Sequence, residues 1–457
     1  MTTTRPTAPT GGDYSEMRHH ELRKVRLVMI DGNLSVNSDS AEGGTSARIY
    51  RNGYWGFASK PGFASAAGEQ VSNKALKNAQ AMATFGQRTA LTMPTSSYQG
   101  EHMFHGKTPY HQKDCVDVLE SMHALCARKY PDLKSTTFIL HSEHHSKNLA
   151  TSTGTRALSS IQRAGYYAIF TAEDEHGQPV ELMDIGSGKG SLADLDLSLA
   201  TLEERFDQLY QHLQAKRVAV PVRGGTHTVV LAPELAGILA HEAIGHPCEA
   251  DLVLGGAVTG DLLGQKVASD LVTMVDFAHS YDGEELTVPV YSDDEGTPAT
   301  DAVLIENGRL KQFMNSRETA IRTGHAPTGN ARAYEYGDEP LVRMRNTAIL
   351  PGQDKLEDII AGVEDGYYLL KTRNGEADST TEFMFGINLG YEIKNGKLGS
   401  AIRDTTLSGN AIRMLQSVDA VSDDMYWSCS GYCGKKQLMV VSSGGPALRG
   451  VAHLGGE

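Results

Sequence analysis

Three Asn-Gly pairs restrict this chain to a fold that contains a substantial amount of antiparallel β-sheet. They begin at Asn52, Asn307 and Asn395, and each lies between two β-like runs. Both residues of such a pair tolerate positive φ, so the pair favours a tight turn between adjacent antiparallel strands. Strict alternation also predicts a half-buried strand at Phe383, Phe385, Ile387 and Leu389. We therefore expect the chain after about residue 285 to be mostly antiparallel sheet.

Helical periodicity is clearer in the first half of the chain. One predicted helix has an apolar stripe that includes Cys115 and Cys126, so both thiols are expected in the core rather than in a reactive site. A second predicted helix starts at a capping box, Thr201–Glu204, and a later short one runs from Asp354 to Gly366.

These elements indicate an α+β chain made of three segments. Residues 1–15 are polar and contain Pro and Gly, which predicts a disordered lead-in. Residues 16–216 would form a mixed α/β N-terminal domain, because the chain turns β-like after the second helix. Residues 217–457 would form a β-rich C-terminal domain.

Composition excludes several classes of function. The formal net charge is −14 and no run of Lys or Arg occurs, which argues against nucleic acid and anionic membranes as partners. No stretch of about eighteen apolar residues exists, so no membrane span is expected, and the N-terminus lacks the apolar core of a signal peptide. The five cysteines fit a reducing compartment, and we expect a cytoplasmic protein.

The polar segment with the clearest chemical pattern is "LAHEAIGHPCEAD", residues 239–251. Glu242 follows His241 directly, and His246 comes five positions after the first histidine. Pro233 and Glu234 predict the start of a helix that contains His241. Side chains five residues apart on a regular helix point about 140° apart, so the two histidines could not reach one ion.

Two neighbours supply the irregularity that this spacing requires. Gly245 lets the backbone leave regular geometry at low cost, and Pro247 disfavours the α region for His246. We therefore expect the helix to end, or to widen into a π-like turn that brings residues i and i+5 together. The segment predicts a metal site; the alternative is a helix end capped by a histidine.

A catalytic zinc site uses three protein ligands and keeps a position open, so a third ligand is needed. The candidates are Cys248, which lies awkwardly close to His246, and Cys429 and Cys433, which lie in a Gly-rich loop near two lysines that would favour a thiolate. Glu242 fits a general base. Glu249 and Asp251 are second-shell or substrate-cleft candidates, with plain surface acids as the alternative.

A second histidine cluster occurs at residues 141–145, "HSEHH". It lacks a frame of apolar residues that would hold ligands still. We therefore interpret it as an exposed segment rather than a second metal site.

Several segments, taken in order, resemble the TldD/PmbA family of metallopeptidases on its catalytic, TldD side. They are HExxxH at His241, "DDEGTPATDAVLIENGRLKQFM" from Asp293, "APTGNAR" from Ala326, "RMRNTAILPG" from Arg343, "TTLSGN" from Thr405, "CGKKQLMVVSSGGPALR" from Cys433 and, near the N-terminus, "SARIYRNGYWGFAS" from Ser46. The similarity covers most of the chain and is strongest from about residue 228 to 449. The chain departs from the family pattern at "HPCEAD" and in its final "GVAHLGGE", so substrate choice is the property that transfers least.

The resemblance implies a mixed α/β N-terminal domain followed by a large curved antiparallel sheet in the C-terminal domain. It implies Zn²⁺ held by His241, His246 and Cys433, with Glu242 as the base. It also implies a homodimer, or a heterodimer with a PmbA/TldE-like subunit that lacks the His-Glu motif. Substrates of such relatives are small or unfolded peptides bound in extended form. The alternatives are an N-deacylase acting on a small N-acylated metabolite and a non-catalytic binding or scaffolding subunit.

Overall fold

The computed structural model describes residues 5–86, 88–104, 106–107, 111–429 and 431–456. Of the predicted disordered lead-in, residues 1–4 lie outside the described residues. In its remainder Pro6 and Pro9 are buried, and strand β1 begins at Tyr14.

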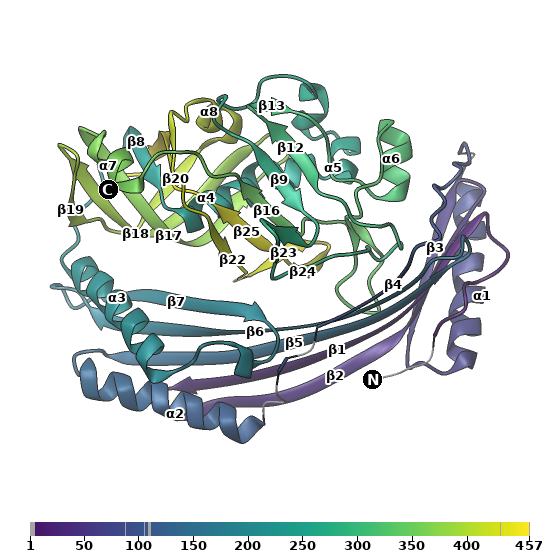
Figure 1. Cartoon of the computed structure of the whole chain (residues 1–457), viewed down its shortest axis with the longest axis horizontal. Helices are drawn as coiled ribbons and strands as arrows, with labels where there is room; N and C mark the ends of the chain where they lie inside the picture. Colours follow the sequence, from purple (N-terminus) through teal and green to yellow (C-terminus); the bar gives the residue numbers. More distant parts are fainter. Residues whose placement is uncertain (1–4, 87, 105, 108–110, 430, 457) are drawn as a thin grey trace.

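The first half of the chain forms one long sheet that curves beneath the second half (Figure 1). Its strand order is β3-β2-β1-β5-β6-β4, and β7 pairs with β6. All pairs are antiparallel except β4 with β6. The strands are β1 (Tyr14–Ile30), β2 (Asn33–Arg51), β3 (Tyr54–Pro61), β4 (Gln99–Phe104), β5 (Ser135–Thr151), β6 (Arg156–Glu173) and β7 (Pro179–Lys189).

Three long helices pack on this sheet: α1 (Ser65–Met82), α2 (Gln112–Lys129) and α3 (Leu199–Arg217); two short 3₁₀ turns are η1 (Ala83–Phe85) and η2 (Leu192–Asp194). Cys115 and Cys126 lie buried in the core under α2, which confirms their predicted packing role. The predicted start of α3 is wrong by three residues. Ser198 caps that helix by accepting the Thr201 backbone N–H, because it lies one residue before the first helical turn.

The second half contains two larger sheets. One has the order β13-β12-β9-β16-β25-β22; the other has the order β17-β8-β26-β20-β18-β19, and β17 also pairs with β18, so five of its strands form a closed ring. Two-stranded pairs join β10 to β11, β14 to β15 and β23 to β24.

The strands of this half are β8 (Gly225–Leu231), β9 (Met274–Phe277), β10 (Ser280–Tyr281), β11 (Glu284–Glu285), β12 (Ala302–Glu306), β13 (Arg309–Leu310), β14 (Ala331–Arg332), β15 (Leu341–Val342), β16 (Asn346–Ile349), β17 (Asp365–Ala377), β18 (Glu382–Lys394), β19 (Lys397–Ala401), β20 (Thr405–Asn410), β21 (Ala420–Val421), β22 (Tyr426–Ser428), β23 (Tyr432–Lys435), β24 (Gln437–Val440), β25 (Ser442–Gly445) and β26 (Leu448–Leu454). The helical segments are α4 (Pro233–Leu239), η3 (Ala240–Gly245), η4 (His246–Cys248), α5 (Ala250–Leu254), η5 (Val258–Leu262), α6 (Arg317–Thr323), α7 (Leu356–Ala361) and α8 (Ala411–Gln416).

All three predicted hairpins are present. Asn52, Asn307 and Asn395 have φ of 51°, 46° and 50°, and the glycine after each also has positive φ. They join β2 to β3, β12 to β13 and β18 to β19. The alternating segment is β18, whose four predicted inward residues are buried. The turn chemistry therefore determines local pairing as expected.

The mixed α and β content and the large antiparallel sheets agree with the expected class, but the long curved sheet lies in the N-terminal half. The C-terminal half instead divides into separate sheets, two of whose pairings, β16 with β25 and β17 with β8, are parallel. Turn signals identify neighbouring strands and carry no information about pairings between distant ones, which is why the sequence did not reveal this division.

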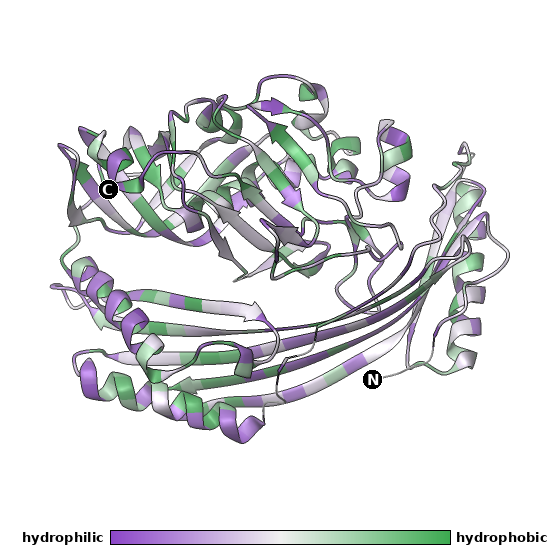
Figure 2. Cartoon of the chain, viewed as in Figure 1, coloured by the Kyte–Doolittle hydropathy of each residue, from purple (hydrophilic) through white to green (hydrophobic). Residues whose placement is uncertain are grey.

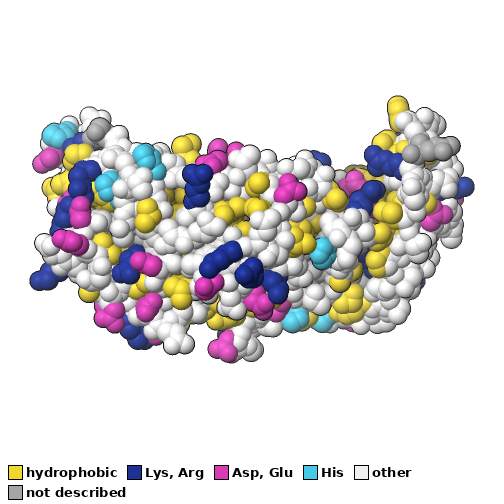
Figure 3. Space-filling model, turned by 90° about the horizontal axis from the view of Figure 1, so that it is seen from above, with side chains coloured by type: hydrophobic (Ala, Val, Ile, Leu, Met, Phe, Trp, Pro, Cys, Tyr) yellow, Lys and Arg dark blue, Asp and Glu magenta, His cyan; other side chains and the backbone are white. Residues whose placement is uncertain are grey.

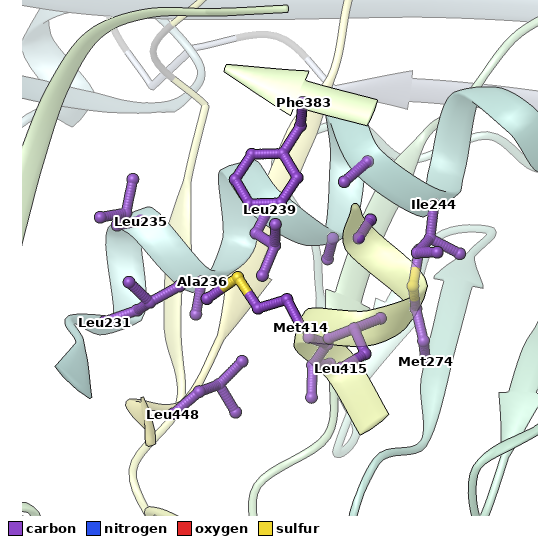
Figure 4. Packing of buried hydrophobic residues seen from close by; sticks show 14 of the residues in the cluster. Leu231, Leu235, Ala236, Leu239, Ile244, Met274, Phe383, Met414, Leu415 and Leu448 are labelled. Atoms are coloured by element: carbon purple, nitrogen blue, oxygen red, sulfur yellow. The ribbon is translucent and has the colours of Figure 1, made fainter. Parts of the chain in front are cut away.

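Helix α4 is surrounded by the apolar core of the C-terminal half. Leu235 and Leu239 on this helix are fully buried, and Phe383, Met414 and Leu448 come from segments far along the chain to enclose it (Figure 4). Burial of this kind fixes the axis of α4 and hence the direction of the segment that follows it. The long helices α1, α2 and α3, in contrast, alternate polar and apolar residues along their length (Figure 2).

Buried ion pairs connect the two halves. Arg48 on β2 donates to Glu295 at 2.6 Å, and Lys147 on β5 donates to Asp294 at 2.7 Å. Burial raises the pKa of the adjacent Asp293 to about 8. A charge that loses its partner in such a place keeps the cost of desolvation, so these contacts hold the halves in one arrangement.

Gly56 tests the packing of α1 on β3. A Cβ at this position would lie 2.0 Å from the Ala75 carbonyl oxygen, whereas one at Gly68 on α1 would make only ordinary contact with Met17. Gly56→Ala should lower the free energy of unfolding by about 1–3 kcal/mol, because the helix must move away. Gly68→Ala should leave it unchanged or raise it by up to about 1 kcal/mol. Urea denaturation measures both, and equal values for the two variants would contradict the close approach.

Candidate metal centre

The helix that begins at Pro233 widens where the two histidines lie. Residues Ala240–Gly245 form a π-helical turn, and a 3₁₀ turn, His246–Cys248, follows it. The backbone N–H of His246 donates to the carbonyl of His241, five residues earlier. Of the two outcomes expected from the sequence, an end of the helix or a wider turn, the structure has the wider turn, which places both rings on one side with centroids 5.2 Å apart.

The reasons predicted for this irregularity are only partly right. Gly245 has ordinary helical angles, φ −57° and ψ −53°, and its missing side chain matters because a Cβ would lie 2.2 Å from Met344 Sδ. His246 also stays in the α region although Pro247 follows it. Close packing overrides the statistical preference before proline, since the Nδ1 of His246 is held by Glu249 at 3.0 Å.

Cys433 completes a three-residue cluster with these histidines. Ligand atoms of His241, His246 and Cys433 all lie within 4.8 Å of one another, and Cys433 Sγ is 3.1 Å from His246 Nε2. Among the described residues, neither Cys248 nor Cys429 belongs to such a group. Cys248 is fully buried in the core of the C-terminal half, and Cys429 is half-buried and packs against that core.

The cluster fits a metal ion of the zinc type. His241 is buried, and neither of its ring nitrogens finds a hydrogen-bond partner among the described residues. An unpaired buried nitrogen is costly, and coordination by a cation would satisfy it. Two imidazoles and one thiolate are ligands that suit zinc, and three protein ligands leave a position open.

A short hairpin, β23–β24, presents Cys433 to the histidines. Arg343, which is fully buried, donates to the carbonyl oxygens of Cys433 at 2.8 Å and Gln437 at 2.9 Å. Lys435 donates to Asp251 at 2.9 Å and lies 3.0 Å from Glu249. Lys435 is one of the two lysines expected to favour the thiolate, and these carboxylates engage its ammonium group.

Electrostatics favour an ionised cysteine. Burial alone would raise the pKa of the Cys433 thiol, but His241 and His246 lower that pKa to about 5. Burial likewise opposes the charge on His246, yet Glu249 and Cys433 raise its pKa to about 10. Glu249 is fully buried, and its pKa is held at about 2 by His246 and Lys435 despite its burial.

The remaining predicted residues surround this cluster. Glu242 lies 4.0 Å from His241 Nε2 and 3.5 Å from His246 Nε2, and its side chain keeps 24% exposure against 5% for His241. Glu249 contacts His246 directly, whereas Asp251 contacts Lys435. Solvent can therefore reach the cluster from the side of Glu242.

The interpretation of residues 141–145 as an exposed segment is wrong. They lie in the middle of β5, where Glu143 and Ser142 are buried and the three histidines are half-buried. Glu143 accepts the hydroxyl of Tyr432, the residue next to Cys433, at 2.5 Å. No local pattern could reveal this contact, because the two residues are 289 positions apart.

Known proteins resemble this chain over most of its length. A family model for the PmbA/TldA metallopeptidase C-terminal domain matches residues 224–450, and one for PmbA/TldA metallopeptidase domain 1 matches residues 15–83. A metalloprotease from Methanothermobacter thermautotrophicus is 31% identical over 96% of this chain and 94% of its own length. The chain belongs to the TldD/PmbA metallopeptidase family. A zinc metalloprotease TldD homolog from Saccharolobus solfataricus is 32% identical to this TldD/PmbA chain. The similarity covers 74% of this chain and 75% of the homolog.

Solved structures share the fold of this TldD/PmbA chain. TldE from Thermococcus kodakarensis aligns with a TM-score of 0.76 at 18% identity, over 97% of both chains. A Thermotoga maritima protein described as a modulator of a DNA gyrase aligns with a TM-score of 0.78 at 19% identity, over 96% of both chains. At such identities the likeness concerns the fold alone.

The surface of this TldD/PmbA chain mixes both signs of charge. Lys and Arg alternate with Asp and Glu on the face seen from above (Figure 3). Within the described ranges, none of the helices combines the length and apolar character needed to span a bilayer.

The thiol reactivity of this cluster can be measured directly. In protein stripped of metal by a chelator, iodoacetamide at about pH 6 should modify Cys433 first, because a thiolate is the nucleophile. Burial raises the pKa of Cys115 and Cys126 to about 12 and also raises the pKa of Cys429. Peptide mass spectrometry identifies the site, with Cys433→Ser as the control. Modification of Cys429 at the same rate would contradict the assignment.

Proposed function

We propose that this chain is a zinc-dependent amide hydrolase of the TldD type that acts on small or unfolded peptides bound in extended form. The single observation that carries the proposal is the convergence of two histidines, a low-pKa cysteine and a partly exposed glutamate at one point. Those residues come from a π-helical turn and from a hairpin almost 190 positions away. Structural packing alone gives no reason for bringing them together.

His241, His246 and Cys433 would hold the ion. A zinc ion bound there would act as a Lewis acid toward the scissile carbonyl and would lower the pKa of water to about 7. Glu249 fixes the ring of His246 through Nδ1, so that Nε2 faces Cys433. Asp251 acts one step further out, by holding Lys435 against Glu249.

Glu242 is the proposed general base. It is the partly exposed carboxylate at the cluster and lies within 4.0 Å of both histidines. A carboxylate in that place can accept a proton from attacking water and deliver it to the leaving amine. His241 and Cys433 are too buried to contact a substrate as freely, which separates binding of the ion from proton transfer.

The family and the surface charge also bear on the partner and the compartment of the protein. We infer that the chain assembles as a homodimer or with a PmbA/TldE-like subunit, and that it works in the cytoplasm. The similarity of fold to TldE supports a pairing of related chains. The acidic net charge and the mixed surface support neither nucleic acid nor membrane as a partner.

Substitutions separate the proposed roles. Cys433→Ser and His241→Ala should lose bound zinc, because each removes one of three ligands. Glu242→Gln should keep about one equivalent of zinc and lose roughly 10²- to 10⁴-fold in kcat, the usual contribution of a general base. Elemental analysis and peptide hydrolysis measure the two effects.

Glu234→Gln serves as the matched control. Glu234 lies on α4 and pairs with Lys371 at 3.6 Å, away from the cluster. It should keep both zinc and activity. Wild-type activity that persists in preparations without zinc would refute the proposal, as would full activity in Glu242→Gln.

Substrate class requires its own measurement. A mixed peptide library and a panel of small N-acylated amines should be tested with the same zinc-loaded protein. We expect cleavage of flexible peptides, since the accessible edge of the cluster is open at Glu242. Turnover of acylated amines alone would favour the N-deacylase, and turnover of neither would favour a binding or scaffolding subunit.

A further inference from the structure

The hairpin that carries Cys433 has few strand contacts to hold it in place. Among the described residues β23 pairs with β24 and with no third strand. Its backbone is instead held by long side chains: Arg343 donates to the Cys433 carbonyl, and Arg332 donates to the Val440 carbonyl at 2.9 Å. Both arginines belong to the C-terminal half. They hold the backbone of the hairpin from that half, and Lys435 adds its contacts with Asp251 and Glu249.

Tyr432 is held from the other half of the molecule. Its hydroxyl donates to Glu143 Oε1 at 2.5 Å, and the Tyr334 hydroxyl donates to the same oxygen at 2.6 Å. The two tyrosine rings meet edge to face with centroids 5.9 Å apart. Glu143 therefore joins two tyrosines of the C-terminal half to β5 of the curved sheet.

Contacts within the curved sheet hold the side chain of Glu143 in place. It is buried on β5, and its second oxygen lies 3.6 Å from His145 Nε2 and 3.7 Å from Arg163. Burial alone would raise the pKa of Glu143, but His145 and Arg163 hold that pKa well below its ordinary value. An ionised carboxylate accepts stronger hydrogen bonds than a neutral one, so the link to Tyr432 is a strong one.

Side chains of the sheet and of the hairpin enclose a small space beside this link. A cavity of about 20 Å³ lies between the sheet and the hairpin, lined by His141, Tyr167 and Cys429 as well as by Glu143 and Tyr432. A volume of that size holds about one water molecule. Beside this space, the hydrogen bond of Tyr432 to Glu143 joins the hairpin to the sheet.

We propose that Glu143 is a positioning residue for the metal centre, which holds Cys433 in reach of His241 and His246 by fixing Tyr432. Its contacts are with Tyr432, Tyr334, His145 and Arg163 rather than with the ligand atoms, and it acts on Cys433 through the Tyr432 hydroxyl. The inference rests on the proposed function, because it assigns a purpose to the place of Cys433. It also gives the N-terminal sheet a role in the site that lies in the other half.

Two variants remove the link from its two ends. Glu143→Ala and Tyr432→Phe should each weaken Co²⁺ or Zn²⁺ binding by roughly 10- to 100-fold, the usual effect of losing an outer partner of a metal ligand. The double variant should lose no more than Glu143→Ala alone, because that variant already removes the hydrogen bond that Tyr432→Phe removes. Competition with a chelator measures the affinity, and the thiolate-to-cobalt absorption band reports whether Cys433 still binds.

The matched controls separate positioning from general damage. Glu143→Gln keeps an oxygen that can accept the Tyr432 hydroxyl, so it should recover most of the affinity and the cobalt band. Glu181→Ala removes an exposed carboxylate from β7 of the same sheet and should change neither. If Glu143→Ala fails to fold, Tyr432→Phe reports on the same hydrogen bond from the hairpin side.

Hydrogen exchange in metal-free protein supplies a readout that does not depend on the ion. Peptides that cover residues 431–440 should exchange faster in Glu143→Ala and Tyr432→Phe than in wild type, while peptides from β18 should not change. Unchanged exchange together with metal affinity within twofold of wild type would overturn the inference. Wild-type protein that binds no metal would instead refute the proposed function, and the exchange data would still decide whether Glu143 positions the hairpin.

Discussion

The hydrogen bond from the His246 N–H to the His241 carbonyl spans five residues instead of four, and the candidate site depends on it. A regular turn would direct the two rings about 140° apart. The wider turn costs helical regularity, and it persists because α4 is enclosed by core residues from both C-terminal sheets. Gly245 contributes by its size, since Met344 occupies the space that any side chain would need.

Ion pairs hold the residues that surround the three candidate ligands. Glu249 is a fully buried carboxylate that meets one histidine and one lysine, and Lys435 brings the hairpin of Cys433 against it. Such a buried group is tolerated only because each charge has an opposite partner. The same principle operates at the boundary between the two halves, where Arg48 and Lys147 meet acidic residues that follow one another in sequence. The site is therefore held from several directions by groups that cannot move independently.

The features predicted correctly from the sequence are local ones. The three hairpins, the buried face of β18 and the widened turn all follow from residues within a few positions of one another. The predictions that proved wrong concern features that pairing or packing between distant residues determines. The "HSEHH" cluster looked exposed because its polar letters carry no trace of the tyrosines that cover Glu143. The backbone of His246 was also predicted wrongly to leave the α region, because the tendency of a residue before proline to avoid that region yields to tertiary contacts.

The sequence by itself determined which chemically reactive side chains this protein has and to which family it is similar. It supplied two histidines at an unusual spacing, a glutamate beside the first and three candidate cysteines, with turn residues that specify hairpins. The family resemblance already implied Cys433 as the third ligand, but only the tertiary structure brings its thiol to the two histidines and the Tyr432 hydroxyl of its hairpin to Glu143 on the curved sheet. The reason is physical: side-chain types and local turns are encoded within short windows. The approach of β23 to α4 and β5 depends on burial and on ion pairs between residues far apart in the chain.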